Sequence, residues 1–264
     1  MNSNTRNTLI LYTTATCNLN CTYCYIDKNP SLQKIDKMLD ESFQGDYYFN
    51  FTKKMFPNPN QLTEIQIWGG EPTLRLDRSF YTIRKCIEHY PNLNRFMFST
   101  NFISENWFEQ FDQFLEIFKD YPNRNFLLNL QLSIDGPPYL NDAQRGQGVT
   151  KKFVKSFQHF LEYSSKIPKN FSIRFFCKQT LSNFSIPLLQ TKEKIIEYYS
   201  FFEDFNTLYL PYKKDNFEFI LTVPNTACPS PHTKEDGIMF ANLCKLCREI
   251  EKEHILRYYF PNLD

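Results

Sequence analysis

The apolar run Thr8-Leu9-Ile10-Leu11-Tyr12-Thr13 leads, after three residues, into Cys17-Asn18-Leu19-Asn20-Cys21-Thr22-Tyr23-Cys24-Tyr25. The first run is typical of a short buried β-strand. The second carries three thiols at C-x3-C-x2-C spacing, so all three can turn toward one point from a single loop. The sequence therefore predicts a strand that ends in a cysteine-bearing loop.

The cysteine loop indicates a metal site. Thiolates select zinc ions or iron–sulfur clusters, and both normally take four protein ligands. This loop offers three thiols, and no histidine lies nearby in the sequence. A four-iron cluster held by three thiolates would keep one iron open for a small-molecule ligand. A zinc knuckle, or cysteines clustered by chance, is the alternative.

The same three cysteines, with Tyr23 directly before the third, resemble the hallmark of the radical SAM (S-adenosylmethionine) enzymes. In that family the open iron is chelated by the amino and carboxylate groups of SAM, and reductive cleavage gives a 5′-deoxyadenosyl radical. The resemblance implies a [4Fe–4S] cluster on Cys17, Cys21 and Cys24, SAM as a second cofactor, and an electron donor of the flavodoxin or ferredoxin type.

A second motif, Gly69-Gly70-Glu71-Pro72-Thr73, matches the GGEP motif that follows the second strand in radical SAM enzymes. Two glycines remove side chains, which lets backbone polar groups meet a ligand amine, and Pro72 fixes the turn. By this resemblance Gly69, Gly70, Glu71 and Pro72 belong to the cofactor site. We expect Glu71 to support the loop rather than to act as a general base.

A third region, Ser133-Ile134-Asp135-Gly136-Pro137 with the downstream Asn141-Asp142-Ala143-Gln144-Arg145, resembles the anaerobic sulfatase-maturating enzymes and their peptide-modifying relatives. The resemblance implies that Ser133 and Arg145 contact the carboxylate or ribose of SAM, and that Asp135 organises the strand end. An arginine suits a carboxylate because its guanidinium donates two parallel hydrogen bonds. Asn141 stands where that branch usually has histidine.

Asn101 resembles the asparagine of the T-N-G sequence that follows the third strand in these enzymes, so we assign it to the cofactor site. Phe102 replaces the glycine of that sequence.

Three thiols and one imidazole also gather near the C-terminal end of the sequence: Cys228, His232, Cys244 and Cys247. Three interpretations stay open. The four residues form a zinc site, or they are the remnant of an auxiliary iron–sulfur site that also uses Cys177, or they are unrelated buried residues.

The pattern along the chain predicts an α/β fold. Strands are expected at 64–68, 95–100, 126–134, 171–176 and 217–223 in addition to 8–13, with helices near 40–56, 77–89, 104–118, 149–163, 195–202 and 237–256. Residues 26–33 are expected to form a polar connection, and Ser104 to cap a helix. Alternating strands and helices imply a parallel sheet. The unusual residues follow strand ends, where barrel enzymes place their chemistry.

Six units are too few for a closed eight-fold barrel, so we expect an open, partial (β/α)6 TIM-like barrel. The family resemblance implies the same fold. We expect a core over residues 1–224 and a C-terminal helical segment over 225–264.

The composition narrows the partners. The chain has 264 residues with 42% hydrophobic and 22% charged residues, which is ordinary for a globular protein. A formal net charge of +1 gives no electrostatic footprint for nucleic acid. No apolar run approaches the roughly 20 residues that span a bilayer. Clustered cysteines without a signal-like N-terminus indicate a reducing, cytoplasmic setting.

We therefore expect a monomeric enzyme without a membrane segment. Its substrate is expected to be a peptide or protein side chain. The alternatives are a small molecule or a tRNA nucleoside, and, in another class, a non-catalytic metal-binding module.

Overall fold

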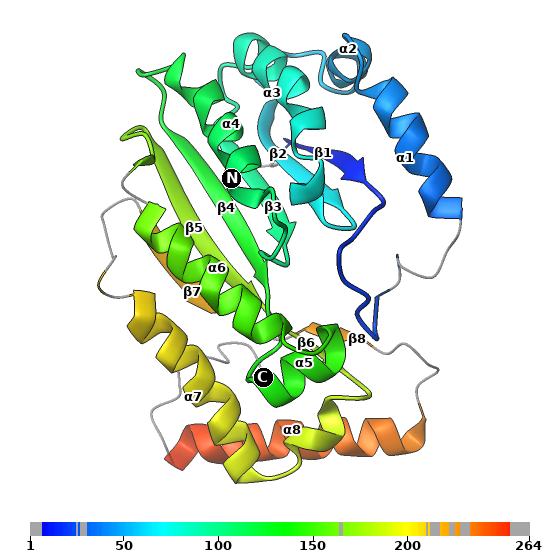
Figure 1. Ribbon diagram of the computed structural model, residues 1–264, viewed down its shortest axis with the longest axis vertical. Helices are drawn as coiled ribbons and strands as arrows, with labels where there is room; N and C mark the ends of the chain where they lie inside the picture. The colour runs from blue at the N-terminus through cyan, green and yellow to red at the C-terminus, as the bar shows by residue number, and fades with distance from the viewer. Residues whose placement is uncertain are drawn as a thin grey trace, which may run out of the picture.

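Six strands form one parallel sheet, in the order β1-β2-β3-β4-β5-β7 (Figure 1). The computed structural model describes residues 7–24, 26, 31–163, 166–209, 211, 217–221, 225–227 and 233–253. The strands of the sheet are β1 (Asn7–Thr14), β2 (Leu62–Gly69), β3 (Arg95–Thr100), β4 (Phe126–Ser133), β5 (Phe171–Lys178) and β7 (Phe217–Leu221). Because all six run parallel, their carboxyl ends meet at one edge of the sheet.

Helices connect successive strands, as the sequence pattern predicts. They are α1 (Ser31–Ser42), α2 (Tyr47–Met55), α3 (Asp77–His89), α4 (Trp107–Lys119), α5 (Pro138–Arg145), α6 (Val149–Tyr163), α7 (Lys192–Tyr209) and α8 (Lys234–Glu253), with the 3-10 turns η1 (Pro72–Leu74) and η3 (Ile186–Leu189). Figure 1 shows α8 crossing one end of the molecule beside α7. The expected α/β partial barrel is confirmed.

The sheet buries one face more completely than the other. Along β4 and β5 every second residue is buried and the residues between are only partly buried. On the buried face, Phe98 of β3 packs edge-on against Phe114 of α4, and Phe175 of β5 packs against Phe157 of α6. Parallel sheets are usually covered on both faces. The partly buried face of this sheet instead leaves space for a cavity.

Two local expectations are wrong, and one helix lies where none was expected. Residues 31–33 begin α1 instead of lying in the connection, and the short helix α5 was not predicted. Helix α1 is stabilised from outside, because Arg78 of α3 binds Asp36 and Asp40 of α1. Ser104 caps no helix: α4 begins after Asn106, and the Ser104 hydroxyl instead lies 2.8 Å from the Thr73 hydroxyl.

The strands β6 (Thr180–Ser182) and β8 (Asn225–Ala227) form a separate parallel pair. β8 therefore joins the segment after residue 224 to the chain that follows β5. α8 packs against α7 and η3. No helix in the described part of the chain is long and apolar enough to cross a membrane.

Candidate active site

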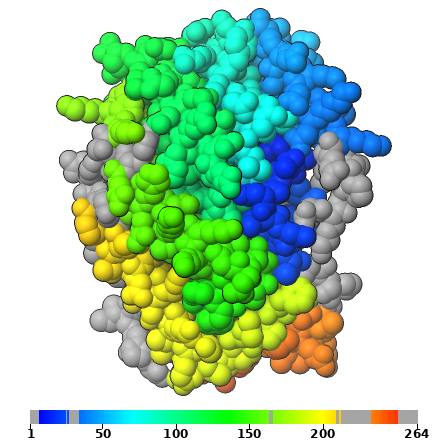
Figure 2. Space-filling view, in the orientation of Figure 1, coloured from blue at the N-terminus to red at the C-terminus, as the bar shows by residue number. Residues whose placement is uncertain are grey.

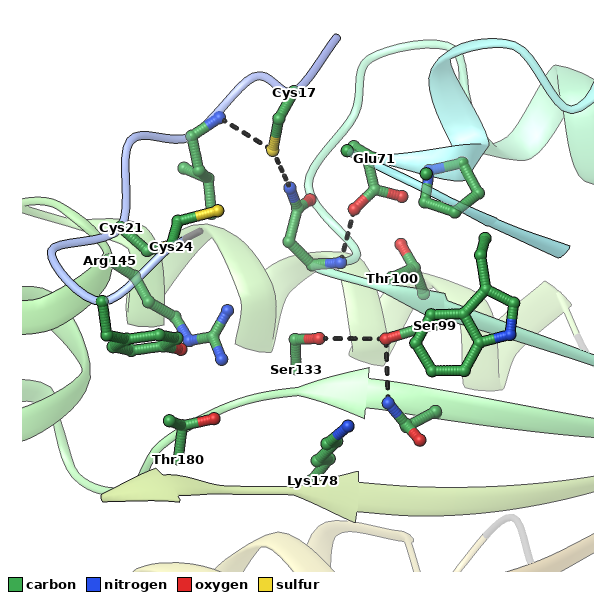
Figure 3. Close-up of a pocket in the computed structure, with 18 residues that line it drawn as sticks. Cys17, Cys21, Cys24, Glu71, Ser99, Thr100, Ser133, Arg145, Lys178 and Thr180 are labelled. Atoms are coloured by element: carbon green, nitrogen blue, oxygen red, sulfur yellow. Dashed lines mark hydrogen bonds between the residues drawn. The ribbon is translucent and has the colours of Figure 1, made fainter. Parts of the chain in front are cut away.

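A cavity of about 300 Å³ lies at the carboxyl ends of the strands. Its walls come from the cysteine loop after β1, the turn after β2, the ends of β3, β4 and β5, and α5 (Figure 3). The sequence-predicted residues that line it are Cys17, Cys21, Tyr23, Cys24, Gly69, Gly70, Glu71, Pro72, Asn101, Ser133 and Arg145. Asp135 lies behind this wall, fully buried.

The three cysteines of the loop are free thiols on one side of the cavity. Cys17 Sγ accepts weak hydrogen bonds from the Leu19 amide at 3.4 Å and from Asn101 Nδ2 at 3.9 Å. Burial raises the pKa of Cys17 to about 12. A bound metal ion deprotonates a coordinating thiol, so the thiolate form depends on such an ion.

The donor set fits an iron–sulfur cluster. Among the described residues, no three His, Cys, Asp or Glu side chains gather closely enough to hold a single metal ion. A four-iron cluster does not need that convergence, because each thiolate binds a different iron. The loop also reaches the surface beside α5 (Figure 2), where the Thr22 amide donates to the Gln144 carbonyl at 2.8 Å.

Gly69 and Gly70 are required for a reason different from the expected one. A Cβ on Gly69 would lie 2.5 Å from the Thr14 carbonyl oxygen, and one on Gly70 would lie 2.4 Å from the Thr16 carbonyl oxygen. The Gly70 amide donates to Thr14 and the Glu71 amide to Thr16. The missing side chains therefore let the turn after β2 press against the backbone that leads to Cys17.

Glu71 joins the turn to the end of β3. Its carboxylate is buried and accepts hydrogen bonds from the Asn101 amide at 2.6 Å and from the Thr73 hydroxyl at 2.6 Å. Burial raises the pKa of Glu71, although these donors oppose the shift. With its oxygens occupied by donors of the protein, Glu71 has the supporting position expected of it.

Asn101 connects Glu71 to the cysteine loop, because its amide donates to Glu71 and its Nδ2 donates to Asn18 Oδ1 at 2.6 Å. The next residue, Phe102, has a φ of 63°, which glycine adopts more readily than any other residue. The backbone at this position thus keeps the conformation that a T-N-G sequence would favour, although Phe102 carries a fully buried side chain.

Asp135 and Arg145 form a buried ion pair beside Tyr23. Arg145 Nε donates to Asp135 Oδ2 at 2.8 Å and Nη2 donates to Oδ1 at 2.9 Å. The Tyr23 hydroxyl donates to Asp135 Oδ2 at 2.8 Å, and its ring centroid lies 5.5 Å from the Arg145 guanidinium. Burial alone would lower the pKa of Arg145, but Asp135 keeps it above its ordinary value.

This ion pair changes the interpretation of Arg145. The two parallel hydrogen bonds that suit a ligand carboxylate are made to Asp135, so the charge of Arg145 is balanced within the protein. Asp135 organises the strand end further by accepting from the Thr180 amide at 2.8 Å. Asn141, which stands in place of a histidine, accepts from the Asp135 amide at 2.9 Å. Contact of Arg145 and Ser133 with SAM stays a prediction.

Seven residues that line the cavity were not among the predicted site residues: Leu19, Trp68, Ser99, Thr100, Gln131, Lys178 and Thr180. A signal for one of them, Gln131, was present. In Leu130-Gln131-Leu132-Ser133, polar residues alternate with apolar ones, which is typical of a strand with one accessible face. Gln131 Nε2 donates to Ser99 Oγ at 3.0 Å, and Ser99 Oγ lies 3.4 Å from Ser133 Oγ.

The C-terminal cysteines are only partly covered by the structure. Cys228 and His232 lie outside the described residues. On α8, Cys244 is partly buried and Cys247 is buried, with the Tyr199 hydroxyl 4.0 Å from the Cys247 sulfur. Cys177 is fully buried in the hydrophobic core rather than on the cavity wall. The zinc and auxiliary-cluster interpretations of this group stay predictions.

The sequence also matches a known protein family. The family model described as the radical SAM superfamily matches residues 11–173, which include the cysteine loop, the Gly-Gly-Glu-Pro turn and Arg145. The chain belongs to the radical SAM superfamily. Membership implies SAM and a [4Fe–4S] cluster as cofactors, and the three thiols of the cavity are the donors that such a cluster takes.

Individual relatives lie in the branch that the third motif resembles. The serine-type anaerobic sulfatase-maturating enzyme of Bacteroides thetaiotaomicron is 25% identical over 202 residues, which cover 75% of this chain and 43% of that enzyme. Two solved structures share the fold. "Native anSMEcpe with bound AdoMet" has 21% identity and a TM-score of 0.53, covering 93% of this chain and 61% of that one. "Native anSMEcpe with bound AdoMet and Cp18Cys peptide" has 20% identity and a TM-score of 0.51, covering 93% and 60%. The radical SAM chain thus spans less than two thirds of each relative's length.

Proposed function

We propose that this radical SAM protein cleaves SAM reductively at a [4Fe–4S] cluster on Cys17, Cys21 and Cys24, and removes a hydrogen atom from a peptide or protein side chain. The observation that carries the proposal is the shared cavity, which brings together the three thiols, the Gly-Gly-Glu-Pro turn and the Ser133–Arg145 region. A simple metal-binding module would not explain the last two.

The chemistry of bond cleavage would come from the cofactors: a bound and reduced cluster would pass one electron to SAM, which would split into methionine and a 5′-deoxyadenosyl radical. The protein's residues position the reactants and restrict water. The backbone contacts of Gly70 and Glu71 to Thr14 and Thr16 hold the start of the cysteine loop. Asn101 and Tyr23 fix that loop against β3 and against the buried Asp135–Arg145 pair.

The decisive measurement is 5′-deoxyadenosine formation. Protein reconstituted without oxygen, then given dithionite and SAM, should release 5′-deoxyadenosine, whereas a triple variant with alanine at the three loop cysteines should bind no cluster and release none. Cys86→Ala is the matched control, because Cys86 is a buried thiol of α3 outside the cavity. An intact cluster that yields no 5′-deoxyadenosine, even with candidate substrates, would refute the enzymatic function.

A peptide substrate is supported by the sulfatase-maturating relative and by the peptide named in one structure of similar fold. The balanced charge, +1 overall, agrees with this choice over nucleic acid. The second candidate is a small molecule or a tRNA nucleoside, whose base the half-buried Trp68 in the cavity wall could stack against.

Mass spectrometry distinguishes between the candidate substrate classes. The reduced enzyme is incubated with SAM and either bulk tRNA or short synthetic peptides, including any precursor peptide encoded beside its gene. A SAM-dependent mass change is expected in a peptide and not in tRNA. Modification of tRNA alone would refute the peptide assignment and leave the radical chemistry intact.

A further inference from the structure

Lys178 is the last residue of β5, and its side chain reaches across the cavity. In the sheet register Lys178 is paired with Ser133, so the two residues lie side by side on neighbouring strands. Both line the cavity, and Figure 3 shows Lys178 on the same side of the sheet as Ser133 and Ser99. Its Nζ lies 5.8 Å from the ring centroid of Trp68, which lines the same cavity from β2, three strands away in the sheet.

The charges around the cavity are unevenly balanced. Of the residues that the structure describes, two cations line it, Arg145 and Lys178. Arg145 is neutralised by its two hydrogen bonds to Asp135. The carboxyl group in the cavity wall, Glu71, is occupied by donors from Asn101 and Thr73. Within the part of the chain that the structure describes, no carboxylate pairs with Lys178.

This imbalance makes an anionic ligand favourable. Partial burial, and then the nearby Arg145, lower the pKa of Lys178, so its charged form gains when an anion approaches. A carboxylate carries the single charge that one ammonium group balances. The Ser99 and Ser133 hydroxyls and the Gln131 amide lie on the same wall and can donate to carboxylate oxygens.

We propose that Lys178 is the carboxylate-binding cation of this cavity, a role that the sequence had suggested for Arg145. The inference rests on the proposed function only in that it takes SAM as one ligand of the cavity. The carboxylate comes either from SAM or from an acidic group of the substrate. Lys178 is thus a binding residue of the site, distinct from the residues that hold the cluster.

Matched pairs of ligands separate the two sources of the carboxylate. In the first pair, the dissociation constants of SAM and of decarboxylated SAM are measured on the cluster-loaded enzyme. In the second, N-acetyl-aspartate methylamide is compared with N-acetyl-asparagine methylamide, with and without saturating SAM. The proteins are wild type, Lys178→Met, Lys178→Arg and the control Lys155→Met, whose lysine is exposed on α6.

Lys178→Met should lower the preference for the carboxylate member of one pair roughly tenfold or more, because a charge-assisted contact is lost. Lys178→Arg should keep most of that preference, and Lys155→Met all of it. An effect on the SAM pair identifies the SAM carboxylate, and an effect on the aspartate pair identifies a substrate carboxylate.

If the wild-type enzyme shows no preference within either pair, or if Lys178→Met leaves both preferences unchanged, the inference is overturned. These outcomes are binding constants, so they are independent of 5′-deoxyadenosine formation. An enzyme that cleaves SAM while Lys178→Met has no effect on either pair keeps its proposed function and loses only the role of Lys178.

Discussion

Phe102 combines an unfavourable backbone conformation with a favourable side-chain environment. Its φ of 63° lies in the left-handed region, which costs a side-chain-bearing residue about 1–2 kcal/mol. Its ring is fully buried and packs against Trp107 and Phe160, with centroids 4.6 Å and 5.6 Å away. Burial of a phenylalanine contributes more than that strain, so the residue is tolerated where related enzymes use glycine.

The backbone strain at Phe102 predicts an inverted order of stability between two variants. Both Phe102→Gly and Phe102→Ala lose the ring, at about 3–5 kcal/mol. The glycine variant should nevertheless be more stable than the alanine variant by about 1 kcal/mol, because glycine accepts a positive φ. Urea unfolding measures the difference.

Phe98, a fully buried residue of β3, supplies the control pair. In an extended strand alanine should be more stable than glycine by roughly 0.5–1 kcal/mol. The same order at Phe102 as at Phe98 would show that the left-handed conformation carries no strain.

For single residues, the sequence predicts which side chains can bind a metal better than it predicts which side chains form an ion pair. The three cysteines were identifiable because spacing within one loop determines what they can bind. The partner of Arg145 was not, although Asp135 lies only ten residues earlier in the sequence. Their pairing requires the turn of α5, an eight-residue helix that begins with Pro138 and lacks a side-chain cap.

Between elements, Asp36 of α1 clamps the segment that leads into the cysteine loop. Its Oδ1 accepts from the Thr14 hydroxyl at 2.8 Å and from the Ala15 amide at 3.2 Å, and its Oδ2 accepts from the Thr16 hydroxyl at 2.7 Å. Arg78 of α3 completes the clamp by donating to Asp36 at 2.8 Å and to the Thr13 carbonyl at 2.6 Å. Two helices thus hold the backbone just before Cys17.

The Asp36 clamp predicts a pH-dependent contribution to stability. Burial opposes ionisation of Asp36, but the hydrogen bonds from Arg78, Thr16 and Thr14 outweigh it and hold its pKa below the ordinary value. The unfolded chain therefore binds this proton more readily. The stabilisation is complete above the unfolded pKa of about 3.9 and disappears as pH falls through the lower folded value.

Asp36→Asn should consequently lower the free energy of unfolding by about 1.5–3 kcal/mol at pH 7. The difference from wild type should shrink below about pH 4, where the carboxylate of the unfolded chain is protonated. Urea unfolding across this range measures it, with Asp204→Asn as a control because Asp204 is exposed on α7. A difference that stays constant with pH would exclude ionic stabilisation at Asp36.

Across the whole molecule, alternation of strands and helices was enough to predict the parallel sheet, and strand-end residues were enough to place the cavity. What the sequence did not predict depends on contacts between distant segments. Residues 31–33 belong to α1, a helix that Arg78 of α3 holds in place. Lys178 lies in the site because β5 extends two residues beyond its expected end.

The alternation of buried and partly buried residues along β4 and β5 has a consequence for how such a protein can diversify. Core packing is assigned to one set of positions, such as Leu130 and Leu132, and the cavity wall to the residues between, such as Gln131 and Ser133. Substitutions that change stability and substitutions that change ligand preference therefore fall at alternate residues of the same strand. A library restricted to the wall positions would sample new specificities while the hydrophobic core stays intact.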